Sequence, residues 1–175
     1  QALQDTAKLL DRALLEAAAL ALHQAQSVQI YGVAASAILG EYLHYKLLRL
    51  GKPAQMFSDM HRAAMNATTL SKDTLVVAIS SSGSTRDLLH VVKLARKQGA
   101  RVLALSNTPR SPLASLSDIQ LVAAKPEGPL CAGALNAKVG VMLLVELLTT
   151  SLIALDEKYS DVSQKTASAT LPLLL

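Results

Sequence analysis

The sequence predicts an α/β protein, a three-layer αβα sandwich built on a five-stranded parallel sheet. Short apolar stretches of strand length alternate with longer helical patterns along the chain, which is the order that a parallel sheet requires. Residues 74–80 (TLVVAIS) are apolar on both faces, as in a strand that helices cover from both sides. Crossovers in such sheets are right-handed, and we favour the flavodoxin-like strand order 2-1-3-4-5, in which the first and third strands are neighbours.

Turn and cap residues set the boundaries in the first half. Gly51 can end a helix in the left-handed conformation, Pro53 cannot continue one, and Asp59 can cap the next. The expected elements are a helix over 2–25, a strand over 28–31, a helix over 35–50, a strand over 54–57, a helix over 59–70 and a strand over 74–80.

The second half repeats the alternation. A helix over 85–98 is predicted by apolar residues at 88, 91, 92 and 95, and Ser84 with Asp87 is interpreted as a capping box at its start. The other expected elements are a strand over 101–106, a turn and short helix over 107–118, a strand over 119–124, an irregular connection over 125–134, a long helix over 132–154 and one more helix in the polar tail.

Length and composition favour one domain spanning residues 1–175. The chain is 51% hydrophobic and only 17% charged, which indicates a subunit interface as well as a core. No uncharged apolar run reaches the roughly 20 residues of a membrane span, so no membrane partner is expected. The chain begins at Gln1 without a signal-peptide pattern, and we interpret it as a piece of a longer protein. The single Cys131 excludes an internal disulfide and fits a cytoplasmic location.

The charge pattern favours a small anionic ligand. The net charge is +4, and the basic residues are spread along the chain. With no Trp and one Phe, the chain lacks the aromatic platform on which nucleic-acid bases stack. The four histidines are scattered and only one cysteine is present, so neither a metal site nor a cofactor is predicted.

Two loops rich in small and hydroxyl residues suggest where the anion binds. Gly32–Ser36 (GVAAS) follows the first strand and Ser80–Thr85 (SSSGST) follows the third, and in the expected order these strands are neighbours. Each loop opens a helix, whose first backbone N–H groups and dipole attract an anion. A single serine such as Ser84 can equally be a simple helix cap. The loops carry neither a Walker lysine nor a G-x-G-x-x-G pattern, so the phosphate of a small molecule is favoured over a nucleotide.

The stretches VQIYGVAASAILGEYLHYKLLRLG and DTLVVAISSSGSTRDLLHVVKLARKQGARVLALSNTPRSPLASLSDIQL resemble the SIS (sugar isomerase) phosphosugar-binding domain. The S-x-S-G-x-T phosphate loop of that family matches at Ser80, Ser82, Gly83 and Thr85. Within the family the chain resembles the C-terminal effector domain of RpiR-type transcription regulators, on the stretches SDMHRAAMNATTLSKDTLVVAIS, SNTPRSPLASLSD and AGALNAKVGVMLLVELLTT. The resemblance implies the SIS fold and an N-terminal helix-turn-helix domain, missing here, through which alone the protein would contact DNA.

The resemblance also implies a ligand class, a phosphorylated sugar or sugar acid as effector. Three positions depart from the family pattern: Ser84 stands where the phosphate loop usually has Glu, Ala34 where the first loop usually has a second Gly, and Cys131 where a basic residue often precedes the last long helix. The predicted ligand-binding residues are Ala35, Ser36, Ser80, Ser81, Ser82, Gly83, Ser84, Thr85, Asn136 and Lys138.

The alternative function is that of an aldose–ketose sugar-phosphate isomerase, which needs a general base near the sugar. The candidate bases are Glu41, Glu127, His61, His90 and Glu146. None is paired with an orienting partner in the sequence pattern, so no catalytic residue is predicted and a sensor that only binds is favoured. A third interpretation is a dimerisation domain whose sugar site has decayed.

We also expect a homodimer or higher oligomer, because the first helix has little polar surface and SIS domains, by the resemblance, usually pair. The apolar residues of that helix include Leu3, Leu10, Leu14 and Ala18. The ligand is expected to order the connection over 125–138 (KPEGPLCAGALNAK) and to draw in Asn136 and Lys138. Such a movement would reset the long helix behind them and change how two subunits sit together.

Overall fold

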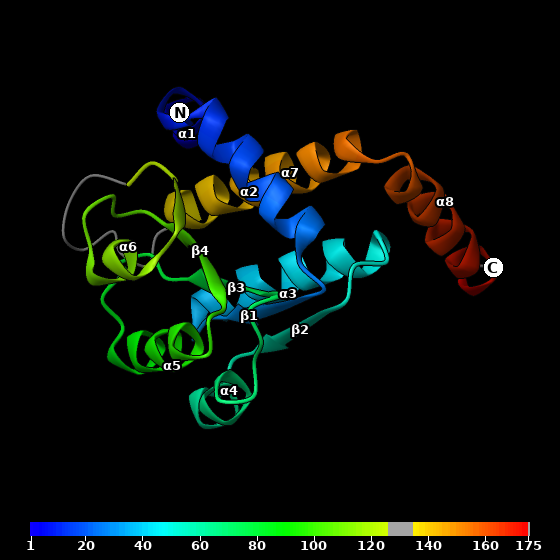
Figure 1. The fold of residues 1–175 in the computed structure, drawn as a ribbon. Helices are drawn as coiled ribbons and strands as arrows, with labels where there is room; N and C mark the ends of the chain where they lie inside the picture. Colours follow the sequence, from blue (N-terminus) through cyan, green and yellow to red (C-terminus); the bar gives the residue numbers. More distant parts are fainter. Residues whose placement is uncertain (126–134, 175) are drawn as a thin grey trace.

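The computed structural model describes residues 1–125 and 135–174, and it confirms the predicted sheet (Figure 1). Five parallel strands hydrogen-bond in the order β2-β1-β3-β4-β5. The strands are β1 (Ser27–Tyr31), β2 (Ala54–Phe57), β3 (Thr74–Ile79), β4 (Arg101–Ser106) and β5 (Ile119–Val122). Each begins and ends within about two residues of its predicted range.

Helices cover both faces of the sheet, which confirms the three-layer arrangement (Figure 1). One layer contains α1 (Ala2–Leu9), α2 (Arg12–Gln24), α3 (Ala35–Arg49) and α7 (Leu135–Leu155), and the other contains α4 (Met60–Ala67), α5 (Arg86–Lys97) and α6 (Pro112–Leu116). Neighbouring residues of β3 point to opposite faces of the sheet. Val77 packs into the core under α2, α3 and α7, whereas Val76 packs into the core under α4 and α5. All six residues of β3 are buried, as its doubly apolar sequence predicts.

Two boundary residues act as the sequence predicts. Gly51 follows α3 with a φ of +68°, a left-handed conformation that glycine adopts without steric strain. The Asp59 carboxylate caps α4 by accepting hydrogen bonds from the backbone N–H groups of His61 and Arg62, at 2.8 and 3.0 Å. These local signals therefore determine where α3 ends and α4 begins.

The prediction of one helix over residues 2–25 was wrong, because the chain breaks at Leu10 and Asp11. Leu10 is extended, with φ −69° and ψ 120°. Asp11 starts α2 by accepting hydrogen bonds from the backbone N–H groups of Ala13 and Leu14. An aspartate stabilises a helix better as a cap than in its interior, and apolar periodicity alone does not reveal such a cap. As a separate element, α1 packs against α7.

α7 is the longest helix in the described part of the chain. Its residues Ala137–Leu155 have a mean hydropathy of 1.9. By length and composition alone, this stretch is long and apolar enough to cross a membrane. α7 packs against α1, α2 and α3, and 39% of this stretch is buried. Leu144, Val145 and Leu148 are completely buried in this contact.

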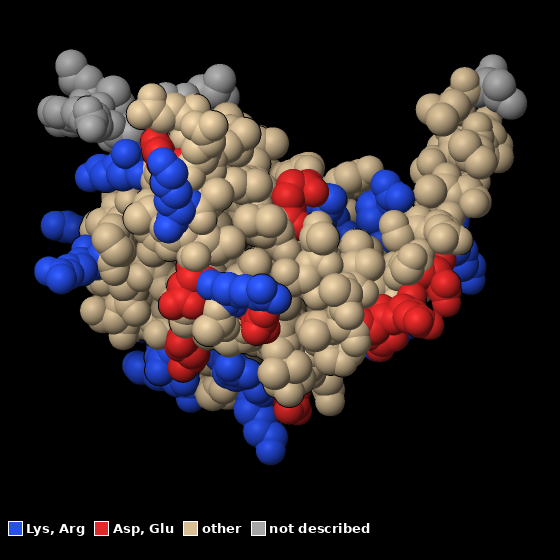
Figure 2. Space-filling model, turned by 90° about the horizontal axis from the view of Figure 1, so that it is seen from above, with Lys and Arg blue, Asp and Glu red and all other residues tan. Residues whose placement is uncertain are grey.

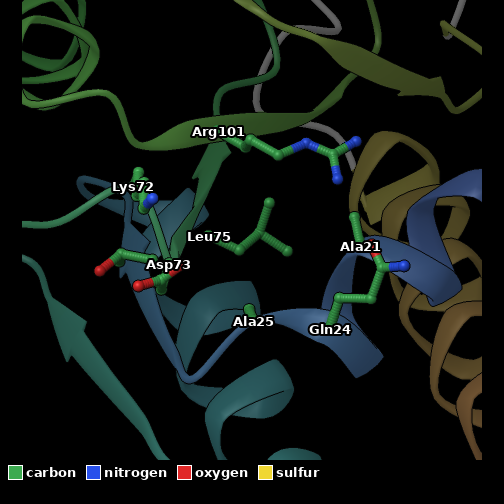
Figure 3. A pocket seen from close by; sticks show the side chains of 8 residues that line it. Ala21, Gln24, Ala25, Lys72, Asp73, Leu75 and Arg101 are labelled. Atoms are coloured by element: carbon green, nitrogen blue, oxygen red, sulfur yellow. The ribbon is translucent and has the colours of Figure 1, made fainter.

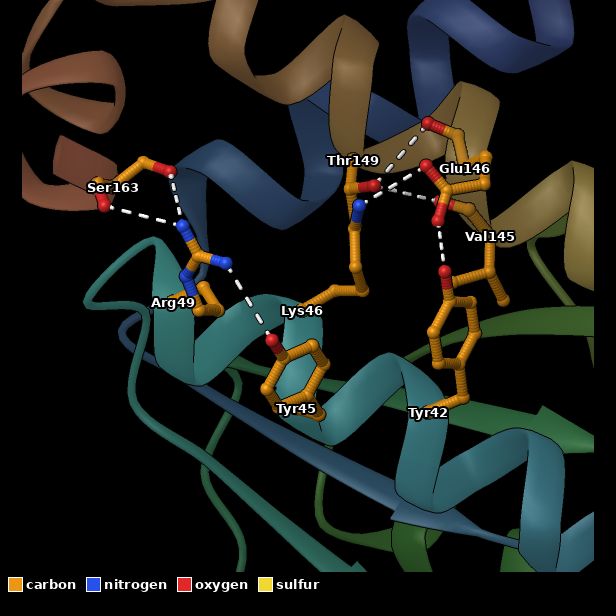
Figure 4. Close-up of polar contacts among 8 residues, drawn as sticks. All are labelled: Tyr42, Tyr45, Lys46, Arg49, Val145, Glu146, Thr149 and Ser163. Carbon is orange, nitrogen blue, oxygen red and sulfur yellow. Dashed lines mark hydrogen bonds and ion pairs between the residues drawn. The ribbon is translucent and has the colours of Figure 1, made fainter. Parts of the chain in front are cut away.

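A polar contact joins α3 to α7 (Figure 4). The Tyr42 hydroxyl donates a hydrogen bond to the Glu146 carboxylate, and the Lys46 ammonium group donates to its other oxygen at 3.0 Å. The hydrogen bond from Tyr42 and the charge of Lys46 hold the pKa of Glu146 below its ordinary value, against the opposing effect of partial burial. The same hydrogen bond raises the pKa of Tyr42.

We expect Glu146→Gln to lower the free energy of unfolding at pH 7 by at most about 1 kcal/mol, since the pair remains partly exposed to solvent. The pKa of Glu146 is depressed by folding, so its contribution is complete above the ordinary glutamate pKa of about 4.3 and is lost as the pH falls through the folded-state pKa. Urea unfolding of both proteins between neutral and acidic pH should show their stabilities converging only below about pH 4.3. A difference that stays constant into that range would contradict a role for the Glu146 charge.

The polar tail forms the additional helix that the sequence predicts, α8 (Lys158–Thr170), followed by a 3-10 helix (Leu171–Leu173). The Arg49 guanidinium group at the end of α3 donates to the backbone and side-chain oxygens of Ser163 (Figure 4). Thr166 in turn donates to the Arg49 carbonyl at 2.9 Å. α8 is thus anchored at the carboxyl end of α3, away from the carboxyl ends of the strands (Figure 1).

Candidate functional site

The two predicted loops meet at the carboxyl edge of the sheet, between β1 and β3. Tyr31 at the end of β1 pairs with Ala78 near the end of β3, so the loops that follow start side by side. The helices that these loops open, α3 and α5, lie on opposite faces of the sheet. This arrangement is the topological switch point at which α/β sheets bind their ligands.

The first loop, Gly32–Ser36, contains a strained backbone. Ala34 has φ 50° and ψ −128°, a conformation that residues with a Cβ atom rarely adopt. Ala34 is also the position at which the family pattern usually has a glycine. Ala35 is exposed and Ser36 is half-buried, so both predicted ligand residues lie at the surface where this loop enters α3.

We expect Ala34→Gly to raise the free energy of unfolding by about 1 kcal/mol. Relief of the positive-φ strain stabilises the folded state by roughly 1–3 kcal/mol. This gain outweighs the roughly 0.5–1 kcal/mol by which the greater flexibility of glycine stabilises the unfolded chain. Thermal unfolding measures the change. Ala35→Gly, in the first turn of α3, is the matched control and should lower stability. If both variants lose stability, Ala34 is not strained.

The second loop, Ser80–Thr85, folds around Gly83. Gly83 has φ +64°, and its N–H group donates to the Ser80 hydroxyl at 3.1 Å. Ser80 is buried, and this bond uses its side chain to hold the loop together. Ser82 is exposed, and its hydroxyl accepts a hydrogen bond from the Ser84 N–H group at 3.2 Å. The loop therefore presents the Ser82 and Ser84 side chains on a turn that glycine makes possible.

α5 begins without a side-chain cap. Thr85 occupies the N-cap position, but its hydroxyl lies 3.2 Å from the Ser80 hydroxyl and makes no hydrogen bond to the first turn of the helix. The predicted capping box of Ser84 and Asp87 was wrong, because Ser84 lies one residue before the cap and its hydroxyl donates to the Ser82 carbonyl. The first N–H groups of α5 are therefore left to bind an anion.

Asn107, directly after β4, was not among the predicted residues. It is 2% exposed, and its Oδ1 atom accepts a hydrogen bond from the Ser81 hydroxyl at 2.6 Å. Its Nδ2 atom donates to the carbonyl oxygens of Ala124 at 3.0 Å and of Ala137 at 3.3 Å. Asn107 thus connects the serine loop to the first turn of α7. The one signal in the sequence that could have indicated Asn107 is its position as a polar residue at the end of a buried strand. That position does not show which groups its side chain contacts.

The structure brings the start of α7 to the same edge of the sheet. Lys138 follows Ala137, whose carbonyl accepts from Asn107, and Lys138 is half-buried. Asn136 lies in the first turn of α7, but its side chain is outside the described part of the chain. Most of the connection that was predicted to close over the ligand, residues 126–134, is also outside the described residues.

The candidate general bases lie on different helices. They are Glu41 on α3, His61 on α4, His90 on α5 and Glu146 on α7, while Glu127 is outside the described residues. His61 and His90 line a pocket between α4 and α5, and within residues 1–125 and 135–174 neither imidazole has a hydrogen-bond partner that would orient it as a base. The same described residues include no group of three or more His, Cys, Asp or Glu side chains placed to hold a metal ion.

Another pocket lies at the opposite, amino edge of the sheet (Figure 3). It is lined by Gln24 at the end of α2, by Lys72 and Asp73 before β3, and by Arg101 at the start of β4. Parallel strands all start at one edge of a sheet and end at the other, so this pocket is separated from the serine loop by the length of the strands. It is distinct from the candidate site.

Charges are mixed on the face formed by α1, α2 and α7. Seen from above, lysines and arginines are interspersed with aspartates and glutamates, and large areas carry neither kind (Figure 2). A surface that binds a nucleic-acid duplex gathers basic side chains into one patch. The described part of this face has no such patch.

The profile of the SIS domain family matches residues 21–151 of the chain. An uncharacterized HTH-type transcriptional regulator of Caldanaerobacter subterraneus is 30% identical over 93% of this chain and 57% of its own length. The HTH-type transcriptional regulator RpiR of Escherichia coli is 28% identical over 87% of this chain and 51% of its own length. The chain thus spans between about half and three fifths of the curated regulators that it matches.

Two solved structures extend the comparison. The Vibrio vulnificus NanR protein, complexed with ManNAc-6P, has a TM-score of 0.94 and 49% identity, and the match covers 98% of this chain and 65% of that one. The sugar isomerase domain of the RpiR transcription factor from Sphaerobacter thermophilus has a TM-score of 0.85 and 24% identity, with 95% and 92% covered, and supports the fold alone. The resemblance seen in the sequence motifs is confirmed: with a family profile that matches well over half of its residues, the chain belongs to the SIS domain family.

Proposed function

We propose that residues 1–175 form one domain that senses a phosphorylated sugar and acts as the effector domain of an RpiR-type transcription regulator of carbohydrate metabolism. The observation that carries this proposal is the uncapped start of α5 beside the hydroxyls of Ser82 and Thr85, a site for a phosphate group. ManNAc-6P, the ligand in the complex of the 49% identical NanR protein, is the first candidate effector.

In this proposal the phosphate lies against the serine loop and the sugar extends toward the first loop and the start of α7. The proposed ligand residues are those predicted from the sequence, Ala35, Ser36, Ser80, Ser81, Ser82, Gly83, Ser84, Thr85, Asn136 and Lys138. Ser82 and Thr85 donate hydroxyl hydrogen bonds to the phosphate, and Gly83 lets the backbone approach it closely. Lys138 and Asn136 are polar partners for the sugar.

Binding without turnover is favoured over isomerisation. Within residues 1–125 and 135–174, the imidazoles of His61 and His90 have no orienting hydrogen-bond partner, and Glu146 is already engaged by Tyr42 and Lys46. Relatives over most of this chain are named as regulators. An isomerase would use the same phosphate site but would also need an oriented base, so a coupled isomerase assay on every sugar phosphate that binds separates the two functions.

The proposal predicts that Ser82→Ala weakens ManNAc-6P binding about tenfold or more. A hydroxyl that donates to a charged phosphate oxygen contributes roughly 1.5–3 kcal/mol, and a tenfold loss is about 1.4 kcal/mol. Isothermal titration of wild type and variant measures the change. Folding should be intact, because Ser82 is exposed.

Ser168→Ala is the matched control, since Ser168 is an exposed serine on α8, far from the serine loop. It should bind as the wild type does. An unchanged dissociation constant for Ser82→Ala would remove Ser82 from the site. A thermal-shift screen of the wild type against hexose, amino-sugar and sugar-acid phosphates tests the function itself. If none of these ligands raises the melting temperature, the proposed function fails.

We further propose a cytoplasmic homodimer or higher oligomer, without a membrane partner, that contacts DNA through a separate domain. Leu3 and Leu14 on α1 and α2 are 48% and 41% exposed, an apolar surface suited to a second subunit, whereas Ala18 is buried in the core of its own chain. Sedimentation at micromolar concentration tests this expectation. A monomer there would contradict it.

A further inference from the structure

We propose that Asn107 is a positioning residue: it sets the distance between the phosphate-binding loop and the sugar-binding start of α7. The inference rests on the proposed function, because it assigns a role within that ligand site. Nothing in the geometry requires Asn107 to touch the ligand. It is almost completely buried, at 2% exposure, behind the loop that would.

The hydrogen bonds of Asn107 reach three separate parts of the site. Oδ1 accepts from the Ser81 hydroxyl at 2.6 Å, inside the serine loop. Nδ2 donates to the Ala124 carbonyl at 3.0 Å, just after β5, and to the Ala137 carbonyl at 3.3 Å, in α7. One rigid amide group therefore spans from the phosphate loop to the helix that carries Lys138.

The chemistry of this bridge is specific to an amide. An asparagine side chain offers one acceptor oxygen and two N–H donors, and here the oxygen faces a hydroxyl while the nitrogen faces carbonyl oxygens. A carboxylate of the same size could still accept from Ser81 but would repel the carbonyls of Ala124 and Ala137. The donor side of the amide is thus the part that holds α7.

Thr108 provides a matched comparison within the same turn. Its hydroxyl donates to the Ser81 carbonyl at 3.1 Å, so it also ties the serine loop to the end of β4. No hydrogen bond from Thr108 reaches α7 in the described part of the chain. Loss of the Thr108 hydroxyl loosens the loop without releasing the helix.

The test compares two ligands that share a phosphate. Isothermal titration gives the affinity for ManNAc-6P, and competition against it gives the affinity for inorganic phosphate, which needs the serine loop alone. We expect Asn107→Ala to lower the ratio of the ManNAc-6P affinity to the phosphate affinity about tenfold. Partial unfolding reduces both apparent affinities by the same factor, so a merely structural role of Asn107 leaves the ratio unchanged.

Asn107→Asp is the second variant, because it keeps the volume and the acceptor for Ser81. Its added charge opposes both phosphates alike and cancels in the ratio, which should again fall about tenfold. Thr108→Val should leave the ratio within about twofold of the wild type. Ratios for both Asn107 variants that equal the wild-type value would overturn the positioning role while the proposed function stands. Wild-type protein that binds neither ManNAc-6P nor inorganic phosphate would overturn the positioning role, and wild-type protein that also binds no other sugar phosphate would overturn the proposed function as well.

Discussion

Gly83→Ala is expected to reduce the affinity for a phosphosugar about a hundredfold or more while the domain still folds. Two effects add at this position. Gly83 has φ +64°, which costs a residue with a Cβ atom about 1–2 kcal/mol. The new methyl group would also overlap the Ser111 hydroxyl and lie 2.6 Å from Ser111 Cβ. The loop must therefore move, and a displacement of Ser82 and of the start of α5 accounts for a loss of about 2.8 kcal/mol in binding.

Gly99→Ala is the control that separates strain from lost binding. Gly99 follows the C-cap of α5 with φ +83°, but a Cβ atom there would meet only Cβ and Cα of Lys72, at 3.6 and 3.9 Å, which are ordinary contacts. Both variants should lose stability in thermal unfolding, and only Gly83→Ala should lose binding in titration. Equal affinities for Gly83→Ala and wild type would mean that the phosphate does not approach this turn.

Gly140→Val is expected to lower the free energy of unfolding by about 2–3 kcal/mol, because it overfills the contact between α1 and α7. A Cβ atom at Gly140 would lie 2.8 Å from Thr6 Oγ1 and 3.0 Å from Ala123 Cβ. Thr6 is completely buried, and its hydroxyl accepts a hydrogen bond from the Ala124 N–H group at 3.0 Å. Hydrogen exchange should show that the backbone amides of α1 lose protection first.

Met142→Val is the matched control on the same helix. Met142 is 39% exposed, so it reports the cost of a β-branched residue in α7 without a clash. Its loss of stability should be well under 1 kcal/mol. If the two valine variants are equally stable, α1 does not depend on the close approach at Gly140.

The sheet and its layers could be predicted because their signals are local and repeated. The doubly apolar β3 indicated a strand covered on both sides, and Asp59 and Gly51 marked helix boundaries that the structure reproduces. The break between α1 and α2 was missed because an unbroken apolar pattern runs through it. The helix breaks there because Asp11 is more favourable as an N-cap than as an interior helix residue, a preference that the apolar pattern does not show.

The location of the candidate site was predicted more completely than the hydrogen bonds within it. Both loops could be located, since strand order alone brings the ends of β1 and β3 together. Which residue occupies the N-cap position of α5 could not be predicted, because Ser84 and Thr85 are equivalent by residue type and differ only in backbone conformation. The contacts of Asn107 join residues up to 30 positions apart, and no local pattern encodes such a distance.

If a phosphosugar binds at the uncapped start of α5, as proposed, the lifetime of the protein would depend on that ligand. A side-chain cap contributes roughly 0.5–2 kcal/mol to a helix, and with the Thr85 hydroxyl turned to Ser80 no side chain makes that contribution at the start of α5. A bound phosphate would take the place of the cap, and a ligand at a hundred times its dissociation constant stabilises a folded protein by about 2.7 kcal/mol. Proteases act on transiently opened protein, whose population falls roughly a hundredfold with that stabilisation. The same metabolite that switches the domain would therefore also protect it from turnover, so that the protein persists longest while its signal is present.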